Sequence, residues 1–301
     1  MKDGMKAVAL GNFDGLHKGH ISVLENTLCA AQKLGIAATA LIFDTHPMAQ
    51  LMGRAPDLIM TAQSRDEKIK TMGITPVTVS FTEIMDYSCE EFVRIILHER
   101  LNARVVSCGF NYRFGKSGAG NCEKLKELCS AYGIETVIAD EVDIDGAPVS
   151  STRIRKAIKE GNVQLAKKML GRPFSYTLPV IHGKELGRSL GFPTANQRFP
   201  DGFIVPLKGV YASVVRISGE EAHIGVTDIG TRPTVNGYGI LSETHIVHYA
   251  GNLYDKVVTV ELVEYLREER TFSSLDKLKE QILQDTERAV DIVTKRTKDV
   301  F

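Results

Sequence analysis

Short apolar runs alternate with helical patterns through the first 170 residues, and this alternation limits the fold more than any other feature of the sequence. Residues 6–10 and 36–43 have the composition of buried strands, and residues 19–34 between them carry apolar side chains at helical spacing. Further strands are predicted at residues 104–108 and 134–139. Strands that alternate with helices of this length predict a parallel sheet in an α/β domain.

Polar residues mark two further helix starts in this half. Ser88, followed three residues later by Glu91, has the spacing of a capping box, and Phe92 and Ile96 supply the apolar face of the helix that follows. Asn121 precedes another stretch with apolar residues at helical spacing. Both helices are expected to cover the predicted sheet.

From about Pro179 the helical patterns stop and β-rich stretches follow one another, separated by turn residues. These stretches are residues 209–217, 222–226, 243–249 and 257–265. They predict an antiparallel sheet or small barrel, which a single helix after Ser273 closes. The two halves join in two short basic helical segments that end at Gly171 and Pro173, so we expect domains of residues 1–170 and 171–301.

The composition excludes several classes of protein. Lys plus Arg and Asp plus Glu number 37 each, and this zero formal charge argues against a general nucleic-acid or membrane-surface binder. No apolar run approaches the roughly 18 residues that a membrane span needs, and the N-terminus has no signal-peptide core. The five cysteines form no CxxC pair and indicate reduced thiols. We expect a cytoplasmic protein without nucleic-acid or membrane partners.

Residues 11–20, GNFDGLHKGH, lie where the first predicted strand gives way to a helix. Ligands of open α/β sheets bind at this place, and helix N-termini favour anions. Gly15 and Gly19 let the backbone approach a phosphate, and the imidazoles of His17 and His20 suit the charge that builds on phosphorus during displacement. A Gly-rich turn with two surface histidines is the plainer alternative, and a metal pair is less favoured because no third ligand is suitably spaced.

This segment resembles the HxGH signature of the nucleotidyltransferase superfamily and, more narrowly, the N-terminal module of the bacterial bifunctional riboflavin kinase/FAD synthetase family. FDTHP at 43–47, GFNYRFGKSGAG at 109–120 and SSTRIR at 150–155 follow in the family's order. Taken alone, FDTHP could be a simple strand-end turn, and SSTRIR a capped basic helix with solvated arginines. The resemblance implies a Rossmann-like, parallel-sheet α/β domain that adenylylates FMN to FAD with ATP. The implied catalytic residues are His17, His20 and Arg155. The implied nucleotide-binding and flavin-binding residues are Gly11, Phe13, Asp14, Gly15, Gly19, His46, Asn111, Arg113, Ser151 and Thr152.

Residues 187–196, GRSLGFPTAN, form a second candidate site. Thr194 and Asn196 alternate in an extended segment, so both can face one metal–phosphate group. Oxygen ligands of this kind suit Mg²⁺ held between a protein and a nucleotide. A plain turn is the alternative for this Gly- and Pro-containing stretch.

The second segment is very similar to the GFPTAN motif of riboflavin kinase modules, and GVYAS, IGTRPT, SETH and LREERTFSS follow in that module's order. The resemblance, which covers nearly the whole chain, implies a small antiparallel β-barrel domain with a C-terminal helix that phosphorylates riboflavin to FMN. It implies Glu243 as the base for the riboflavin 5′-hydroxyl, although a charged residue on an exposed strand is the plainer alternative. Implied ligands of Mg²⁺ are Thr194 and Asn196, and implied nucleotide-binding residues are Gly187, Gly191 and Arg232.

Three residues depart from the kinase pattern: Leu178, Asp228 and Asp255 stand where glycine, asparagine and glycine are usual. An extra carboxylate close to ATP would repel phosphate unless Mg²⁺ or Arg232 offsets it. Two other functions therefore stay open, namely an FMN adenylyltransferase with an inactive kinase-like module and a flavin-binding or regulatory protein without turnover. The expected partners are riboflavin, FMN, FAD and ATP, and a weakly associated homo-oligomer is left open.

Overall fold

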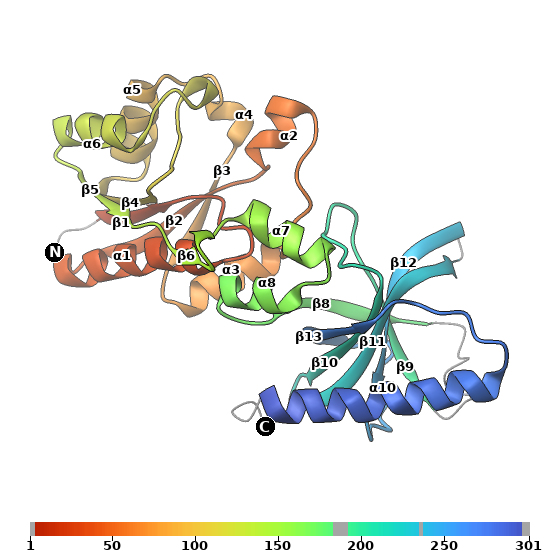
Figure 1. Cartoon of the computed structure of the whole chain (residues 1–301). Coiled ribbons are helices and arrows are strands. Elements are labelled where there is room, and N and C mark those ends of the chain that lie inside the picture. Colours follow the sequence, from red (N-terminus) through yellow and green to blue (C-terminus); the bar gives the residue numbers. More distant parts are fainter. Residues whose placement is uncertain (1–3, 183–191, 235–236, 297–301) are drawn as a thin grey trace. The chain divides into compact units, whose positions relative to one another are not determined.

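The computed structural model describes residues 4–182, 192–234 and 237–296 (Figure 1). The chain divides into two compact units, Met1–Ser151 and Thr152–Phe301. The predicted domain boundary at residue 170 lies two helices further along the chain and stays a prediction. Among the described residues, no helix is both long and apolar enough to cross a membrane.

The first unit is built on a parallel sheet of five strands in the order β3-β2-β1-β4-β5. The strands are β1 (Lys6–Leu10), β2 (Ala37–Phe43), β3 (Thr75–Val79), β4 (Ala103–Gly109) and β5 (Glu135–Ala139). The predicted α/β parallel sheet is therefore confirmed, with β3 as a strand that the sequence reasoning did not find.

Helices cover both faces of this sheet (Figure 1). Ala7 and Ala9 of β1 pack in one core with α1 (Lys18–Leu34) and α3 (Ala62–Thr71). Val8 and Leu10 point the other way, into a core with the π-helix η1 (Phe92–Arg100) and with α6 (Cys122–Ala131). The remaining helices and strands of the unit are α2 (Pro47–Met52), α4 (Phe81–Ile84), α5 (Cys89–Glu91), the 3₁₀ turn η2 (Lys116–Gly118) and the hairpin β6 (Asp143–Ile144) with β7 (Ala147–Pro148).

The helix expected after Ser88 differs from the prediction in its winding. The capping box is present, because Ser88 N donates to the Glu91 carboxylate at 2.8 Å and Glu91 N donates to Ser88 Oγ at 3.1 Å. From Phe92 onward the helix is a π-helix. The buried residues Phe92, Ile96 and Leu101 are four and five positions apart, and the wider i→i+5 turn keeps such a spacing on one face.

The second unit begins within α7 (Ser151–Lys159), whose first residue belongs to the first unit. It continues with α8 (Val163–Leu170) and a closed antiparallel barrel in the order β10-β11-β12-β9-β8-β13. Its strands are β8 (Phe174–Ile181), β9 (Thr194–Arg198), β10 (Gly209–Ile217), β11 (His223–Thr234), β12 (Gly237–Ile246) and β13 (Val257–Arg267), and α10 (Leu275–Arg296) follows. The predicted barrel with a C-terminal helix is confirmed.

The two faces of the barrel wall have different neighbours. Inside, Tyr176 Oη and Ser242 Oγ are 2.6 Å apart, and Gln197 Nε2 donates to Leu178 O at 2.7 Å. Outside, α10 packs on β10, β11 and β13 and buries Ala289 against the apolar residues of those strands. Glu243 neighbours Ser242 in β12, so its side chain points outward.

Candidate active sites

The loop between β1 and α1 is held in shape by Asp14. The buried Asp14 carboxylate accepts hydrogen bonds from the backbone N–H of Ile59 at 3.0 Å and of Met60 at 3.4 Å. Gly15, with φ +82°, turns the chain next to it, and a Cβ there would lie 3.1 Å from Ile59. Asp14, a predicted binding residue, therefore fixes the loop by these contacts.

His17 and His20 come together at the N-terminus of α1. His17 caps the helix, and its Nδ1 accepts a hydrogen bond from His20 N at 3.3 Å. The two rings stack with centroids 3.6 Å apart and 18° between their planes. Because Nδ1 of His17 is an acceptor, the proton of the neutral ring is assigned to Nε2, which makes Nε2 a donor. A donor at a helix N-terminus suits an anionic ligand.

Phe13 and two glycines complete the packing around these rings. The buried Phe13 ring meets His20 edge-on at 5.5 Å between centroids. A Cβ at Gly11 would lie 3.1 Å from the Phe13 ring, and one at Gly19 would lie 3.3 Å from the His17 ring. The small residues at these positions therefore make room for the aromatic side chains.

Two further predicted segments leave the sheet at the same edge as this loop. Leu10 of β1 pairs with Leu41 of β2, and the parallel β1–β4 pairing places the carboxyl end of β4 beside that of β1. His46 follows β2 and caps α2, where its Nδ1 accepts from Met48 N at 3.2 Å. The exposed Asn111 and Arg113 follow β4. The structure thus brings the three loops that carry these residues to one edge of the sheet.

Ser151, Thr152 and Arg155 lie on α7. Ser151 Oγ donates to the backbone carbonyl of Asp14 at 3.0 Å, which joins the start of the helix to the histidine loop. Thr152 and Arg155 are counted with the second unit, so their position relative to the histidines stays a prediction. Sequence reasoning missed Arg65, whose Nη1 donates to Asn12 O at 3.4 Å, because the two residues share no motif.

In the barrel, the predicted base and a predicted metal ligand are direct neighbours. Glu243 of β12 is paired with Asn196 of β9 on one side and with Asp228 of β11 on the other. Directly opposite residues of antiparallel strands point to the same face. The three polar side chains therefore form a row across the outer face, hereafter the Glu243 row.

The side-chain oxygen of Asn196 is suited to bind a cation. Its side-chain Oδ1 is buried and accepts no hydrogen bond from the residues that the structure describes, while its Nδ2 donates to Thr194 O at 3.3 Å. An amide oxygen left without a donor is a ligand that Mg²⁺ accepts. Thr194 lies two positions earlier, on the same side of β9. Within the described ranges, no cluster of three or more His, Cys, Asp or Glu residues could hold a metal.

A cavity of about 420 Å³ opens beside Thr194 and Asn196. The Tyr254 ring at its wall stacks on His182 with centroids 4.0 Å apart. Sequence reasoning missed residues 249–254 of this wall, whose only signal in the sequence is the pair Tyr249 and Tyr254 on either side of a turn. Besides Thr194 and Asn196, the wall includes Val180, Ala195, Ile246, Tyr249, Leu253 and Tyr254.

His245 lies two positions after Glu243, opposite Thr194. Its Nδ1 is 3.1 Å from Pro193 O, and the Phe192 ring meets it edge-on. Burial lowers the pKa of His245 below its ordinary value, against the opposing effect of the Pro193 carbonyl. A neutral imidazole thus borders the row at pH 7.

The three departures from the kinase pattern have different surroundings. Asp228 joins the Glu243 row, whereas Leu178 is buried inside the barrel, on the other face of the wall. Asp255 has φ +63°, which glycine adopts more readily than other residues. Of the remaining predicted residues, Gly187 and Gly191 lie outside the described residues, and Arg232 is described only as part of the β11 backbone.

Comparisons with known proteins match each half of the chain to a different family model. A family model described as FAD synthetase matches residues 1–153, and one described as riboflavin kinase matches residues 170–293. A Haemophilus influenzae protein named bifunctional riboflavin kinase/FMN adenylyltransferase is 34% identical to this chain, over 94% of this chain and 92% of that protein. The Escherichia coli K12 protein of that name is 33% identical, over 92% and 90%. A crystal structure described as a macrolide-efflux protein from Streptococcus pneumoniae is 30% identical with a TM-score of 0.85, covering 97% of this chain and 94% of its own.

Proposed function

The chain belongs to the family of bifunctional riboflavin kinase/FMN adenylyltransferases, and from that membership we propose how its residues divide the two reactions. The chain phosphorylates riboflavin to FMN and adenylylates FMN to FAD, with ATP as co-substrate. We assign adenylylation to residues 1–170 and phosphorylation to residues 171–301. The two family matches, which leave residues 154–169 between them, support a boundary near residue 170.

Phosphorylation requires a base because an alcohol is a poor nucleophile at neutral pH. The Glu243 row carries this assignment, since it places a carboxylate next to a buried amide oxygen that lacks a donor among the described residues. Glu243 takes the proton of the riboflavin 5′-hydroxyl. Asn196 and Thr194 hold Mg²⁺, which when bound neutralises charge on the ATP phosphates. The adjoining cavity receives the adenine against Tyr249 and Tyr254.

Adenylylation needs no base, because the FMN phosphate has a second pKa of about 6 and attacks largely as a dianion. It needs donors on the α-phosphate and on the departing pyrophosphate. His17 Nε2, His20 and the N-terminus of α1 supply them at the carboxyl edge of the sheet. Arg155, with Ser151 and Thr152, is proposed to add contacts to the ATP phosphates. His46, Asn111 and Arg113 are proposed to border the same nucleotide and flavin.

Chromatography of flavins after incubation with ATP and Mg²⁺ tests these assignments, once with riboflavin and once with FMN. His20→Ala is expected to lower FAD formation from FMN by roughly 10²–10³-fold and to leave FMN formation intact. Glu243→Gln is expected to lower FMN formation by roughly 10²–10⁴-fold and to leave adenylylation intact. His98→Ala and Glu261→Gln change the same residue types away from both sites and serve as controls.

Other outcomes would favour the alternatives. FAD from FMN with riboflavin untouched would identify an FMN adenylyltransferase with an inactive kinase-like module. Flavin binding without either product would identify a binding or regulatory protein. We further propose a cytoplasmic location, which the five free cysteines support, and partners that are flavins and ATP rather than nucleic acid or a membrane.

A further inference from the structure

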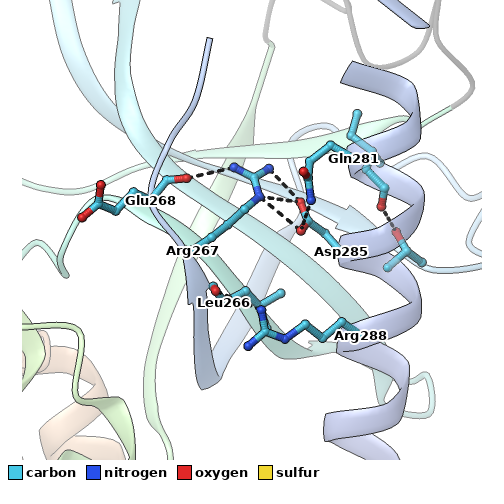
Figure 2. Close-up of polar contacts among 8 residues, drawn as sticks. Leu266, Arg267, Glu268, Gln281, Asp285 and Arg288 are labelled. Atoms are coloured by element: carbon cyan, nitrogen blue, oxygen red, sulfur yellow. Dashed lines mark hydrogen bonds and ion pairs between the residues drawn. The ribbon is translucent and has the colours of Figure 1, made fainter. Parts of the chain in front are cut away.

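Arg267, the last residue of β13, forms a largely buried ion pair with Asp285 in α10 (Figure 2). Nε and Nη2 of Arg267 lie 3.0 and 2.7 Å from Asp285 Oδ2, and Gln281 Nε2 donates to Oδ1 at 3.0 Å. The two side chains are only 13% and 6% exposed. A guanidinium fork on a carboxylate fixes orientation as well as distance, so the pair determines where α10 crosses the end of β13.

The same guanidinium also holds the segment that connects β13 to α10. Its Nη1 donates to Glu268 O at 2.9 Å (Figure 2), and its central carbon lies 5.9 Å from the centre of the Phe272 ring. The second distance is within the range of a cation–π contact. One side chain therefore ties together the strand end, residues 268–274 and the helix.

The Arg267–Asp285 pair, hereafter the anchor, is connected to the Glu243 row through paired strand residues. Arg267 is paired with Val210, Val210 with Asp228, and Asp228 with Glu243. Three strand spacings of about 4.8 Å put the two ends roughly 14 Å apart along the wall. Val210 is buried beneath α10, so the helix covers the wall between Arg267 and Asp228.

The cavity assigned to ATP is lined from other elements. Its residues come from β8, from β9 and Pro193 just before it, from β12 and from the segment between β12 and β13, with none from α10 or from residues 268–274. An attacking alcohol and the departing group lie roughly in line on opposite sides of the transferred phosphoryl group. With ATP in the cavity beside Asn196, the alcohol reaches Glu243 from a side other than that of the cavity. On the side of Glu243 nearest the anchor, α10 covers the barrel wall.

We propose that Arg267 and Asp285 are positioning residues for riboflavin in the kinase reaction. They touch no reacting atom. They hold α10 and residues 268–274 where these elements bound the riboflavin side of Glu243. This inference rests on the role of Glu243 proposed above.

The test uses Asp285→Asn and Arg267→Lys in the full chain. Asp285→Asn removes the charge without changing the size of the side chain, and Arg267→Lys keeps the charge without the fork. We expect the KM for riboflavin to rise at least about tenfold in Asp285→Asn, since small misplacements near a reacting centre have large effects, and less in Arg267→Lys. The KM for ATP and the rate of FMN adenylylation are expected to stay at their wild-type values.

The control is Arg296→Gln. It removes a second ion pair between α10 and β13, in which Arg296 Nη2 lies 2.7 Å from Glu264 Oε2. This pair joins the same elements at the level of His245 and not of Glu243, so its loss should lower the melting temperature without changing the KM for riboflavin. Should Asp285→Asn fail to fold, Gln281→Ala removes only one hydrogen bond to Asp285 and is expected to raise the same KM more weakly.

A lower melting temperature with an unchanged KM for riboflavin in the folded variants would overturn the proposal, because the pair would then serve stability alone. An equal rise in the KM for ATP would overturn it too. If Glu243→Gln retained full phosphorylation, the assignment of the base would fail instead. The two failures are therefore distinguishable.

Discussion

Asp228 lies directly opposite Glu243 in the β11–β12 ladder, so two carboxylates face the same side of the barrel. Like charges in this arrangement disfavour each other and any further negative charge nearby. Of the three residues that depart from the kinase pattern, Asp228 is thus the one that lies beside the proposed base and next but one to Asn196.

Replacing Asp228 by asparagine should favour ATP binding to the kinase module. The repulsion between directly opposite like charges is worth about 0.2–1 kcal/mol, and tenfold in affinity is about 1.4 kcal/mol. Asp228→Asn is therefore expected to lower the KM for ATP in riboflavin phosphorylation by up to about fivefold. Initial rates at varied ATP measure this, with the turn residue Asp201→Asn as control. An unchanged or higher KM would show that the Asp228 charge is already offset.

Two glycine variants separate backbone strain from damage to the histidine loop. Gly15 and Gly35 have φ of +82° and +65°, but only Gly15 has a neighbour, Ile59, that a Cβ would crowd. Gly35→Ala is expected to cost about 1 kcal/mol of unfolding free energy with normal FAD formation. Gly15→Ala should also reduce FAD formation from FMN, because Ile59 N holds Asp14. Denaturant unfolding and flavin chromatography measure both effects, and equal FAD formation in the two variants would contradict the expectation.

Acid should destabilise the barrel through His245. Because burial lowers the pKa of His245 in the folded state, the unfolded chain takes up this proton at a higher pH than the folded chain does. Stability is therefore lost as the pH falls below the ordinary histidine value of about 6.5. Melting curves between pH 7.5 and about 5.5 should show a smaller decrease for His245→Gln than for the wild type or the His98→Gln control. A parallel decrease in all three proteins would count against this role.

The five thiols should differ widely in reactivity. Cys29 is exposed, whereas Cys108, Cys122 and Cys129 are buried. Burial raises the pKa of Cys129 to about 11 and raises that of Cys108 as well, and only the thiolate reacts with alkylating reagents. Alkylation of the folded protein at about pH 8, followed by mass spectrometry of peptides, should modify Cys29 first. Rapid modification of Cys108 or Cys129 before unfolding would contradict the described core.

Sequence patterns were most informative where local residues determine an element. The strand predicted at 6–10 has the bounds of β1, and the one predicted at 209–217 has those of β10. The edge strand β3 was missed because Thr75–Val79 mixes polar residues with a proline and buries only Val79 fully. The π-helical winding after Phe92 was missed because its apolar spacing resembles that of an α-helix over one turn.

In the candidate sites too, the sequence predicted local arrangements but not contacts between residues that are distant in the chain. His17 and His20 are three residues apart at the start of a helix, and the sequence predicted that both imidazoles would lie beside a phosphate, whereas the stacking of the two rings is seen only in the structure. The contacts of Asp14 with Ile59 and of Arg267 with Asp285 join residues that are distant in the chain. The neighbours of Glu243 depend on strand register, and a shift of one residue would turn its side chain inward. Only the folded barrel determines that register.

The closed barrel places its first strand beside its last, since Phe174 in β8 pairs with Leu262 in β13. The strands of the parallel sheet all precede β8 in the chain, so a ribosome makes every one of them before the first strand of the barrel. The barrel cannot close until residue 267 has emerged, and until then β8 exposes an unpaired edge that other nascent chains could join. For a cell, the hazardous stage in making this protein is the synthesis of its second half.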